Sequence, residues 1–249
     1  AHTFLTQTPL REVTSGVFDA WDYRGEVDGA LTFYQRLDAV LPPPEIDLRV
    51  DFSDLQVYME QPGLTLDRLK GSLLYNSVSG FQGSLVDGHL LDGKIAIAGA
   101  GSAEQIELEL AGSLPAQAVA RWLELPLLDF AQGTVHYDGF LRSSAAQGSV
   151  LELSSTLESV ELDVPRPFAK GLGAVLPMSI KLPLEENPQF AVSLGERLHM
   201  AVQLKEDSVE RVAAAVGGEA PKMDACDQRY CLSGSLSTLD IAAWADFYQ

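Results

Sequence analysis

Alternation of apolar and polar residues is the feature that most constrains the fold of this chain. It runs through segments 46–52, 55–60, 106–110, 160–164, 180–184, 190–194 and 198–204. A period of two is typical of β-strands that bury one face and expose the other. Turn sequences such as Gln61-Pro62-Gly63 and Asp92-Gly93 separate the segments, and such short connections favour antiparallel neighbours. The sequence therefore predicts a mostly β protein, built as a long antiparallel meander of about twelve strands.

Helical periodicity is confined to two short segments, each of which contains a tryptophan. Residues 115–123 begin with a proline and include Trp122. Residues 238–247 include Trp244 and follow Ser237, a residue type favoured at helix N-caps. We expect a short helix in each place.

The few helices limit how the sheet can bury its apolar face. Residues 167–170 are expected to form a single turn, and residues 8–21 fit a helix or a loop equally well. A second layer of helices is therefore not available to cover the strands. The sheet is expected to close into a barrel, to fold into a sandwich, or to curl with its apolar face toward something else.

A short sequence pattern occurs twice in the chain. Gly112-Ser113-Leu114, followed by Ala120 and Trp122, recurs as Gly234-Ser235-Leu236, followed by Ala242 and Trp244. A coincidence of common residue types is the alternative to a true repeat. The organisation we predict is one elongated segment over residues 1–249, with sub-repeats of about 1–125 and 126–249 that each end in a short helix bearing a tryptophan.

The charge balance excludes several classes of partner. The chain has 17 Lys and Arg against 35 Asp and Glu, for a net charge of −18. Nucleic acids and anionic bilayer surfaces both require clustered cations. The longer uncharged runs, such as residues 171–180, fall well short of the ~20 residues that span a membrane. Because neither an initiating methionine nor a signal peptide is evident, we expect this to be an excised or processed piece of a longer protein.

Residues that usually carry catalysis do not assemble into a motif. The histidines His2, His89, His136 and His199 are scattered and lack metal-ligand spacing. Residues 88–94 match a phosphate-loop pattern, but Ile95 stands where Ser or Thr is needed, so this stretch is interpreted as a hairpin turn at Asp92-Gly93. No enzymatic activity, metal or cofactor is predicted.

The two cysteines, Cys226 and Cys231, enclose a polar tetrapeptide. We predict a small structural disulfide, worth about 2 kcal/mol by chain entropy, which would indicate an oxidising compartment. A redox-active pair is the alternative, although the spacing is not CxxC and no thioredoxin-like pattern surrounds it.

An ordered series of phrases resembles the YhdP-type branch of the AsmA-like (AsmA/TamB) bacterial envelope proteins. The phrases lie at residues 23–31, 69–75, 112–115, 133–137 and, most tellingly, at 154–170, where SSTLESVELDVPRPFAK is similar to the family phrase S-x-L-x-G-x-x-x-D-L-P-x-P-x-x-K. The chain departs from the family in having Ser159 where glycine is usual and in its cysteine pair. None of these phrases is a catalytic motif.

The resemblance implies a curled, elongated β-sheet, or β-groove, whose inner face is apolar. It implies a periplasmic segment of a bridge-like protein that conducts phospholipid acyl chains between the inner and outer membranes. The partners implied are acyl chains and neighbouring segments of the same longer chain, which itself is implied to be anchored in the inner membrane. Neither a cofactor nor contact with nucleic acid is implied.

Candidate groove residues are the apolar members of the alternating segments. They are Leu48, Val50, Val57, Leu73, Tyr75, Ile97, Leu108, Val135, Tyr137, Leu153, Leu162, Leu182, Val192, Met200 and Val202. The alternative is that they fill a closed core, in a structural or adhesive β-rich envelope module without lipid cargo. A carbohydrate-active jelly roll ranks third, because aromatic residues make up only 8% of the chain and do not form a row.

Overall fold

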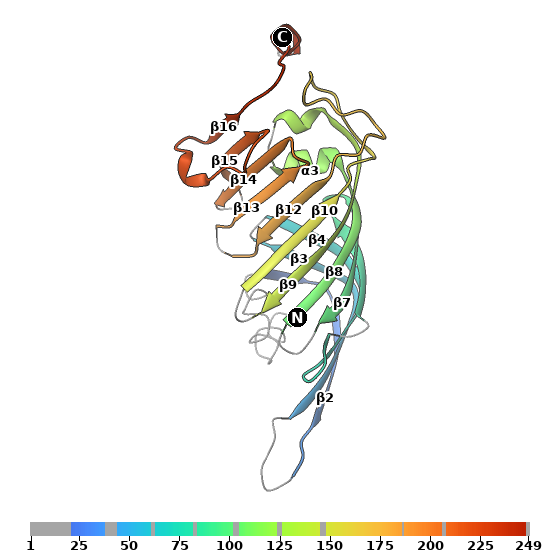
Figure 1. Cartoon of the computed structure of the whole chain (residues 1–249). Helices are drawn as coiled ribbons and strands as arrows, with labels where there is room; N and C mark the ends of the chain where they lie inside the picture. Colours follow the sequence, from blue (N-terminus) through green and yellow to red (C-terminus); the bar gives the residue numbers. More distant parts are fainter. Residues whose placement is uncertain are drawn as a thin grey trace.

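A single curled sheet dominates the computed structural model of this chain (Figure 1). The structure describes residues 21–37, 44–60, 63–81, 84–101, 105–123, 126–144, 148–185, 187–205 and 208–247. Within these ranges, sixteen strands belong to the sheet. The prediction of a mostly β chain with few short helices is confirmed.

The elements follow the chain in order. The first half contains β1 (Trp21–Arg24), β2 (Val27–Tyr34), β3 (Glu45–Met59), β4 (Leu64–Asn76), β5 (Gly80–Phe81), β6 (Ser84–Leu90), β7 (Gly93–Gly101), β8 (Gln105–Pro115), α3 (Ala116–Leu123) and the 3-10 helix η2 (Pro126–Phe130). The second half contains β9 (Ala131–Ser144), β10 (Gly148–Ser155), β11 (Val160–Leu162), β12 (Met178–Pro183), β13 (Gln189–Leu194), β14 (Leu198–Lys205), β15 (Ser208–Val216), the 3-10 helix η3 (Met223–Ala225), β16 (Tyr230–Gly234) and α4 (Ile241–Phe247).

Strands pair with their neighbours in the chain almost throughout. The order across the sheet is β1-β3-β4-β6-β7-β8-β9-β10-β12-β13-β14-β15-β16, with β2, β5 and β11 paired at the side of this path. All of these pairs are antiparallel except one. The last strand, β16, runs parallel to β15, which corrects the prediction of a wholly antiparallel sheet. The connection 217–229 is long enough to bring the chain back across the sheet before β16 begins, and a parallel pair needs such a crossover.

The break in alternation at Ser53-Asp54 does not end a strand. β3 continues through both apolar segments, and its register against β4 shifts between Phe52 and Leu55. Phe52 and Leu55 are three residues apart and would lie on opposite faces of a regular strand. The bulge keeps both of them on the same face.

A tight hairpin joins β6 to β7 within residues 88–94, as predicted, but its turn lies one residue earlier than the predicted Asp92-Gly93. Leu90 pairs with Gly93, and the two turn residues, Leu91 and Asp92, both have positive φ angles, of 47° and 63°. Positive φ at both central positions is the signature of a type I′ turn. Gly93, the residue after the turn, is required because a Cβ there would lie 2.0 Å from the carbonyl oxygen of Ser113 on β8.

Both predicted helices form, but the second begins later than expected. α3 covers residues 116–123, in agreement with the prediction, whereas α4 begins at Ile241 rather than at 238. Its N-cap is Asp240, whose Oδ1 accepts a hydrogen bond from the backbone N–H of Ala243 at 3.0 Å, and not Ser237. Either residue type is a good cap, and the choice between them depends on where the chain leaves β16.

Two shorter segments complete the comparison with the sequence. Residues 165–168 form a turn closed by the N–H of Phe168 on the carbonyl oxygen of Pro165, and Lys170 then forms a bridge with Leu162. Of the ambiguous stretch 8–21, only Trp21 falls within the described residues, where it begins β1.

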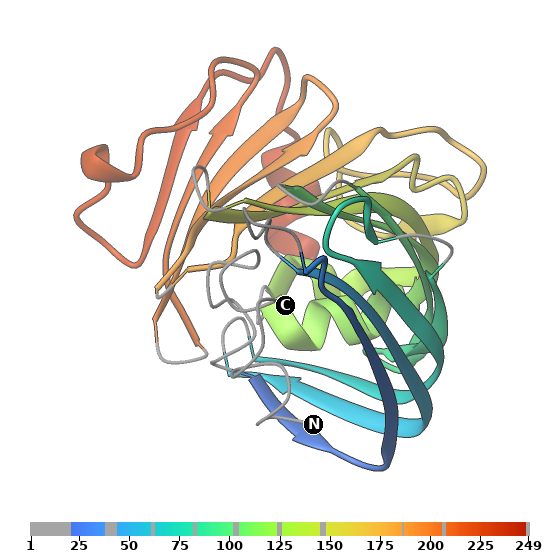
Figure 2. The same ribbon diagram turned by 90° about the horizontal axis from the view of Figure 1, so that it is seen from below.

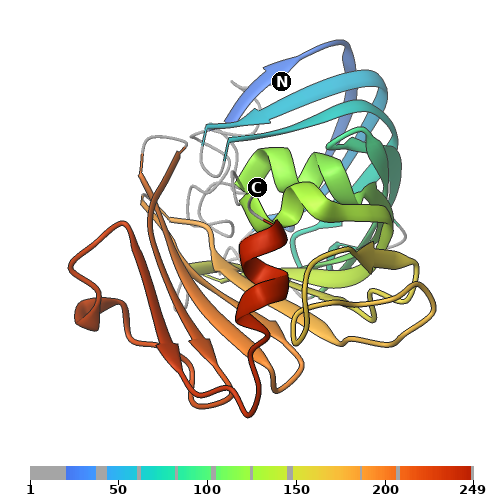
Figure 3. The same cartoon turned by 90° about the horizontal axis from the view of Figure 1, so that it is seen from above.

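Of the three ways in which the sheet could bury its apolar face, the structure adopts the curl. Viewed from below and from above, the strands wrap partly around α3 (Figures 2 and 3). Among the described residues, the two ends of the sheet, at β1 and β2 and at β16, do not pair with each other. The side of the sheet toward α3 is called the concave face below, and the opposite side the outer face.

Replacing Gly112 with alanine should destabilise the sheet. A Cβ at this position of β8 would lie 2.2 Å from the Lys94 carbonyl oxygen and 2.5 Å from the Tyr137 hydroxyl. We expect Gly112→Ala to lower the free energy of unfolding by about 1–3 kcal/mol, measured by urea denaturation. Gly171→Ala is the matched control, because a Cβ there meets nothing within 4 Å. Equal stability of the two variants would contradict the close approach of β7 and β9 to Gly112.

Candidate functional site

The concave face carries an unbroken apolar row that crosses the sheet from β2 to β16. Cross-strand partners in a sheet lie on the same face, so a row can be followed from pair to pair. Its members, one from each successive strand, are Val27, Phe52, Gly71, Val86, Ile97, Leu110, Gly139, Leu153, Ile180, Val192, Met200, Ala214 and Leu232. No polar side chain interrupts it.

A second row runs beside the first, two residues further along each strand. One stretch joins Leu108, Leu141, Leu151 and Leu182. A further stretch joins Phe190, Val202, Val212 and Tyr230. The concave face is therefore apolar in two dimensions, across the strands as well as along them.

The outer face differs in chemistry. In the middle of the sheet it carries charged side chains that pair across strands: Arg142 on β9 binds Glu107 at 2.8 Å and Glu152 at 2.7 Å, and Lys181 on β12 binds Glu152 at 3.2 Å. The hydrogen bond from Lys181, with support from Arg142, lowers the pKa of the Glu152 carboxyl. These groups are partly exposed, so each ion pair contributes little to stability. Together they make this part of the outer face charged, in contrast to the apolar concave face.

Apolar residues of the concave face form three clusters. The N-terminal cluster is centred on buried residues of β3, β4, β8 and β9, and it includes Leu55, Val57, Leu114 and Val135. The C-terminal cluster is centred on β12 to β15, and it includes Phe190 and Val202. The β3–β4 cluster is smaller and is built from Leu48, Val50 and Tyr75.

Every candidate groove residue belongs to one of these clusters, so all of them share the concave face. The N-terminal cluster contains Val57, Leu73, Ile97, Val135, Tyr137, Leu153 and Leu162; the C-terminal cluster contains Leu182, Val192, Met200 and Val202; the β3–β4 cluster contains Leu48, Val50, Tyr75 and Leu108, with Leu73 shared. The structure thus brings them together in groups and not in one place.

Exposure divides the candidates further. Leu73, Ile97, Leu108, Leu153, Leu162 and Met200 are half-buried. Leu48, Val50, Val57, Tyr75, Val135, Tyr137, Leu182, Val192 and Val202 are buried. Only the half-buried group offers surface to another molecule without a change in conformation.

α3 accounts for part of this burial, and a place in or beside the groove is a position that the sequence allows for both tryptophan helices. Ala116, Ala118, Ala120 and Leu123 are all less than 9% exposed, while Val119 and Trp122 pack against both the N-terminal and the C-terminal clusters. The helix therefore lies within the curl, as Figures 2 and 3 show. A signal was present, since a helix that is apolar on nearly all sides is expected to be buried, and only Gln117 and Arg121 break the pattern in residues 116–123.

The concave face also contains polar groups, among them Tyr75, Tyr137 and the pair Ser143 and Ser149. Burial raises the pKa of the Tyr137 hydroxyl to about 12, and that hydroxyl lies 3.4 Å from the carbonyl oxygen of Lys94. Ser143 and Ser149 are buried and lie 2.7 Å apart, hydroxyl to hydroxyl, so each satisfies the other. None of these groups is arranged to fix a polar ligand.

Lys170 is the one charged residue that the described structure buries. Its Nζ donates to the carbonyl oxygens of Val160 and Gly171, and burial lowers its pKa against the opposing effect of Glu158 and Glu161. The residue closes the phrase 154–170 that carries the family resemblance. Its contacts indicate a structural role, because it holds the segment after β11 against the sheet.

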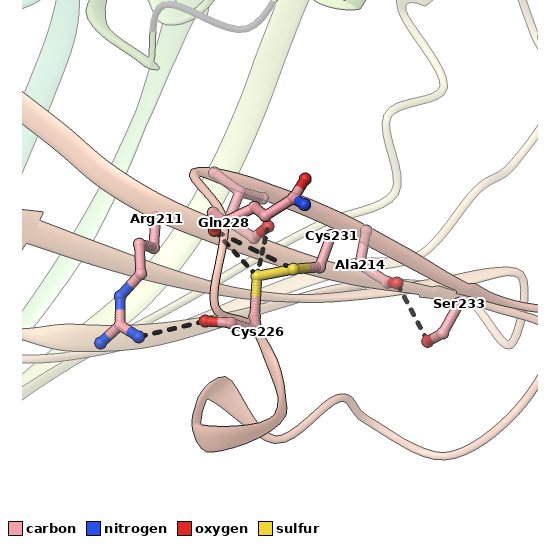
Figure 4. Close-up of a disulfide and its surroundings, with 7 residues drawn as sticks. Arg211, Ala214, Cys226, Gln228, Cys231 and Ser233 are labelled. Atoms are coloured by element: carbon pink, nitrogen blue, oxygen red, sulfur yellow. Dashed lines mark hydrogen bonds between the residues drawn. A yellow bond between two sulfur atoms is a disulfide. The ribbon is translucent and has the colours of Figure 1, made fainter.

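Cys226 and Cys231 form a disulfide on the outer face (Figure 4). Cys226 and Met223 are buried against Ala201 of β14 and Ala213 of β15. The carbonyl oxygen of Cys226 accepts a hydrogen bond from Arg211 at 3.2 Å, and the Ser233 hydroxyl donates to Ala214 at 3.3 Å. The disulfide loop thereby covers the small residues of β14 and β15 and leads into β16.

The second tryptophan helix docks differently from the first. No residue of α4 is buried, and it is held by Trp244 and Phe247 against Phe130 and Phe168. The indole Nε1 of Trp244 donates to the carbonyl oxygen of Arg166 at 3.3 Å. The two copies of the repeated order therefore share a strand followed by a helix, but only α3 enters the concave face.

The described residues contain no arrangement typical of a metal centre. No group of three or more His, Cys, Asp or Glu in this part of the chain is arranged to hold a metal ion. In the same residues, no helix combines the length and the apolar character needed to cross a bilayer.

Comparison with known proteins places the chain among the AsmA-like envelope proteins, a non-enzymatic transport class. The family model described as YhdP protein matches residues 1–249, and the chain belongs to this family. No curated protein and no solved structure matches it.

The buried Tyr137 should make stability depend on pH under alkaline conditions. Its pKa is raised from about 10 in the unfolded chain to about 12 in the folded one, so only the unfolded chain loses the proton in this window. The free energy of unfolding should therefore fall as pH rises from 10 to 12, by at most about 1.4 kcal/mol per pH unit. Tyr137→Phe should reduce that slope, measured by urea denaturation at several pH values; an unchanged slope would show that Tyr137 ionises equally in both states.

Proposed function

We propose that this chain is a periplasmic segment of a bridge-like lipid transport protein and that its concave face conducts phospholipid acyl chains. The observation that carries the proposal is the unbroken apolar row from β2 to β16. Several of its members, including Phe52, Ile97, Leu110, Leu153 and Ile180, are only half-buried. A continuous apolar surface of this kind gains free energy when acyl chains replace water on it.

The chemistry of the face suits movement better than tight binding. Contact with an acyl chain is worth about 25 cal/mol per Å² of apolar area and has no preferred direction. The polar groups of the face, such as Ser143 and Ser149, bind each other and do not anchor a ligand. Acyl chains can therefore slide from one position of the row to the next without leaving a deep energy minimum.

The direction in which acyl chains would move relative to the strands follows from the same geometry. The apolar row runs across the strands, and neighbouring strands lie ~4.8 Å apart. The strands at its two ends carry exposed apolar side chains: Leu31 and Phe33 on β2 are 58% and 59% exposed, and Leu232 on β16 is 74% exposed. In the proposal, acyl chains move from strand to strand and pass at these ends to neighbouring segments of the same longer chain.

Location and partners complete the proposal. Family membership supports a place between the inner and outer membranes, with the full-length protein anchored in the inner membrane. The disulfide between Cys226 and Cys231 agrees with an oxidising compartment such as the periplasm. The proposed mechanism requires neither a cofactor nor a catalytic step.

One observation favours the second candidate, a structural or adhesive envelope module with a closed core and no lipid cargo. Many of the apolar residues of the concave face are buried, and α3 fills part of the curl. If side chains of the protein covered the whole concave face, no apolar surface would be left for acyl chains. The two candidates differ in what the half-buried residues contact.

Crosslinking at neighbouring positions of β8 separates the candidates. Leu110 lies in the apolar row of the concave face, whereas Glu109, the adjacent residue, is exposed on the outer face. A photo-activatable residue at 110 should label phospholipid in cells several-fold more than the same residue at 109. Organic extraction of protein purified without detergent, followed by mass spectrometry, should recover phospholipid. Equal labelling at both positions together with an empty extract would favour the structural module.

A further inference from the structure

α3 holds a distinctive place in the described structure because it joins the two large clusters of the concave face. Val119 and Trp122 are the residues that pack against both the N-terminal and the C-terminal clusters. The N-terminal cluster belongs to the wall formed by β3 to β9, and the C-terminal cluster to the wall formed by β12 to β15. These two side chains therefore occupy the space between the walls.

The start of the helix is fixed by the sheet itself. Pro115, the last residue of β8, still pairs with Thr134 of β9, and α3 begins at the next residue. Small side chains at 116, 118 and 120 allow the helix backbone to approach the strands closely. On its solvent side, Arg121 binds Asp92 of the β6–β7 turn at 3.1 Å, an exposed contact that adds little.

Exposure along β8 shows where the cover given by α3 ends. Leu114, next to the helix, is 8% exposed, whereas Leu110 and Leu108 on the same face are half-buried. Leu114 and Leu110 lie four residues apart, or ~13 Å along a strand. The concave face thus has a part packed under α3 and a part left for cargo, and the half-buried Trp122 belongs to the helix that separates them.

We propose that Trp122, assisted by Val119, contacts the acyl chains and sets how many of them the concave face can hold. This inference rests on the proposed function and adds to it a residue that determines the lipid capacity of the concave face. A tryptophan suits the role because its large, rigid ring keeps the two walls apart and offers a wide apolar surface. A smaller side chain would leave room that further acyl chain can fill.

Fluorescence quenching tests the contact without requiring a disruptive change. The chain has three tryptophans, so Trp21→Phe with Trp244→Phe leaves Trp122 as the sole indole. Loading this variant from vesicles of phosphatidylethanolamine brominated in the middle of its acyl chains should quench its fluorescence several-fold relative to unbrominated lipid. A variant that keeps only Trp244, which is held against Phe168 and Phe247, should be quenched far less.

Lipid load tests the effect on capacity. Trp122→Ala should raise the ratio of phospholipid to protein by roughly half or more, measured by quantitative mass spectrometry after detergent-free purification. Gln117→Ala, on the exposed side of the same helix, should leave the ratio unchanged. Trp122→Leu keeps an apolar side chain of intermediate size and serves if the alanine variant does not fold; its ratio should lie between the wild-type and alanine values.

The outcomes are distinguishable. Lipid in the wild-type protein with no quenching of Trp122, or with the same load in the Trp122 variants, would overturn the role of this residue and leave the proposed function standing. Absence of lipid from the wild-type protein would overturn the proposed function itself, and this inference with it.

Discussion

The register of the sheet is the constraint on which the rest of this structure depends. Side chains alternate between faces along a strand, so a slip of one residue would move a whole strand of apolar side chains to the outer face. The bulge in β3 between Phe52 and Leu55 prevents such a change of face. A second irregularity does the same where Gln203 and Leu204 of β14 pair with Arg211 and Val209 of β15, since it keeps Val209 and Val212 on one face. Because of these two irregularities, the apolar residues on both sides of each one lie on the concave face.

Much of the fold could be predicted because the signals are local. The alternation of apolar and polar residues predicted the strands. The turn residues in 88–94 predicted the β6–β7 hairpin, and the proline before an apolar segment predicted the start of α3 within one residue. The parallel pairing of β16 could not be predicted, because nothing within residues 230–234 specifies the direction of a neighbour. The same applies to the start of α4, where Ser237 and Asp240 are both suitable caps and the path of the chain after β16 decides between them.

The sequence pattern assigns each candidate residue to a face of the sheet, but it does not determine how exposed that residue is. Period two assigns each apolar residue to a face, which is why the candidates all lie in the three clusters of the concave face. Exposure is set by what covers a residue, and the cover of Val57 and Val135 includes contacts between elements far apart in the chain. Tyr137 illustrates the same limit: its spacing predicts the face, but only its packing explains a pKa of about 12.

The two tryptophan helices show why a similar order of residues leads to different packing. α3 leaves a strand that is still paired at Pro115, so its first turn is held against β9 and its apolar residues must enter the curl. α4 follows the exposed residues 235–240 and contacts the aromatic rings of Phe130 and Phe168 and the carbonyl oxygen of Arg166. Apolar surface that α3 covers stabilises the fold, whereas surface that it leaves open adds less to stability. Under the proposed function, the side chains of α3 therefore determine how much of the concave face stabilises the protein and how much is open to acyl chains.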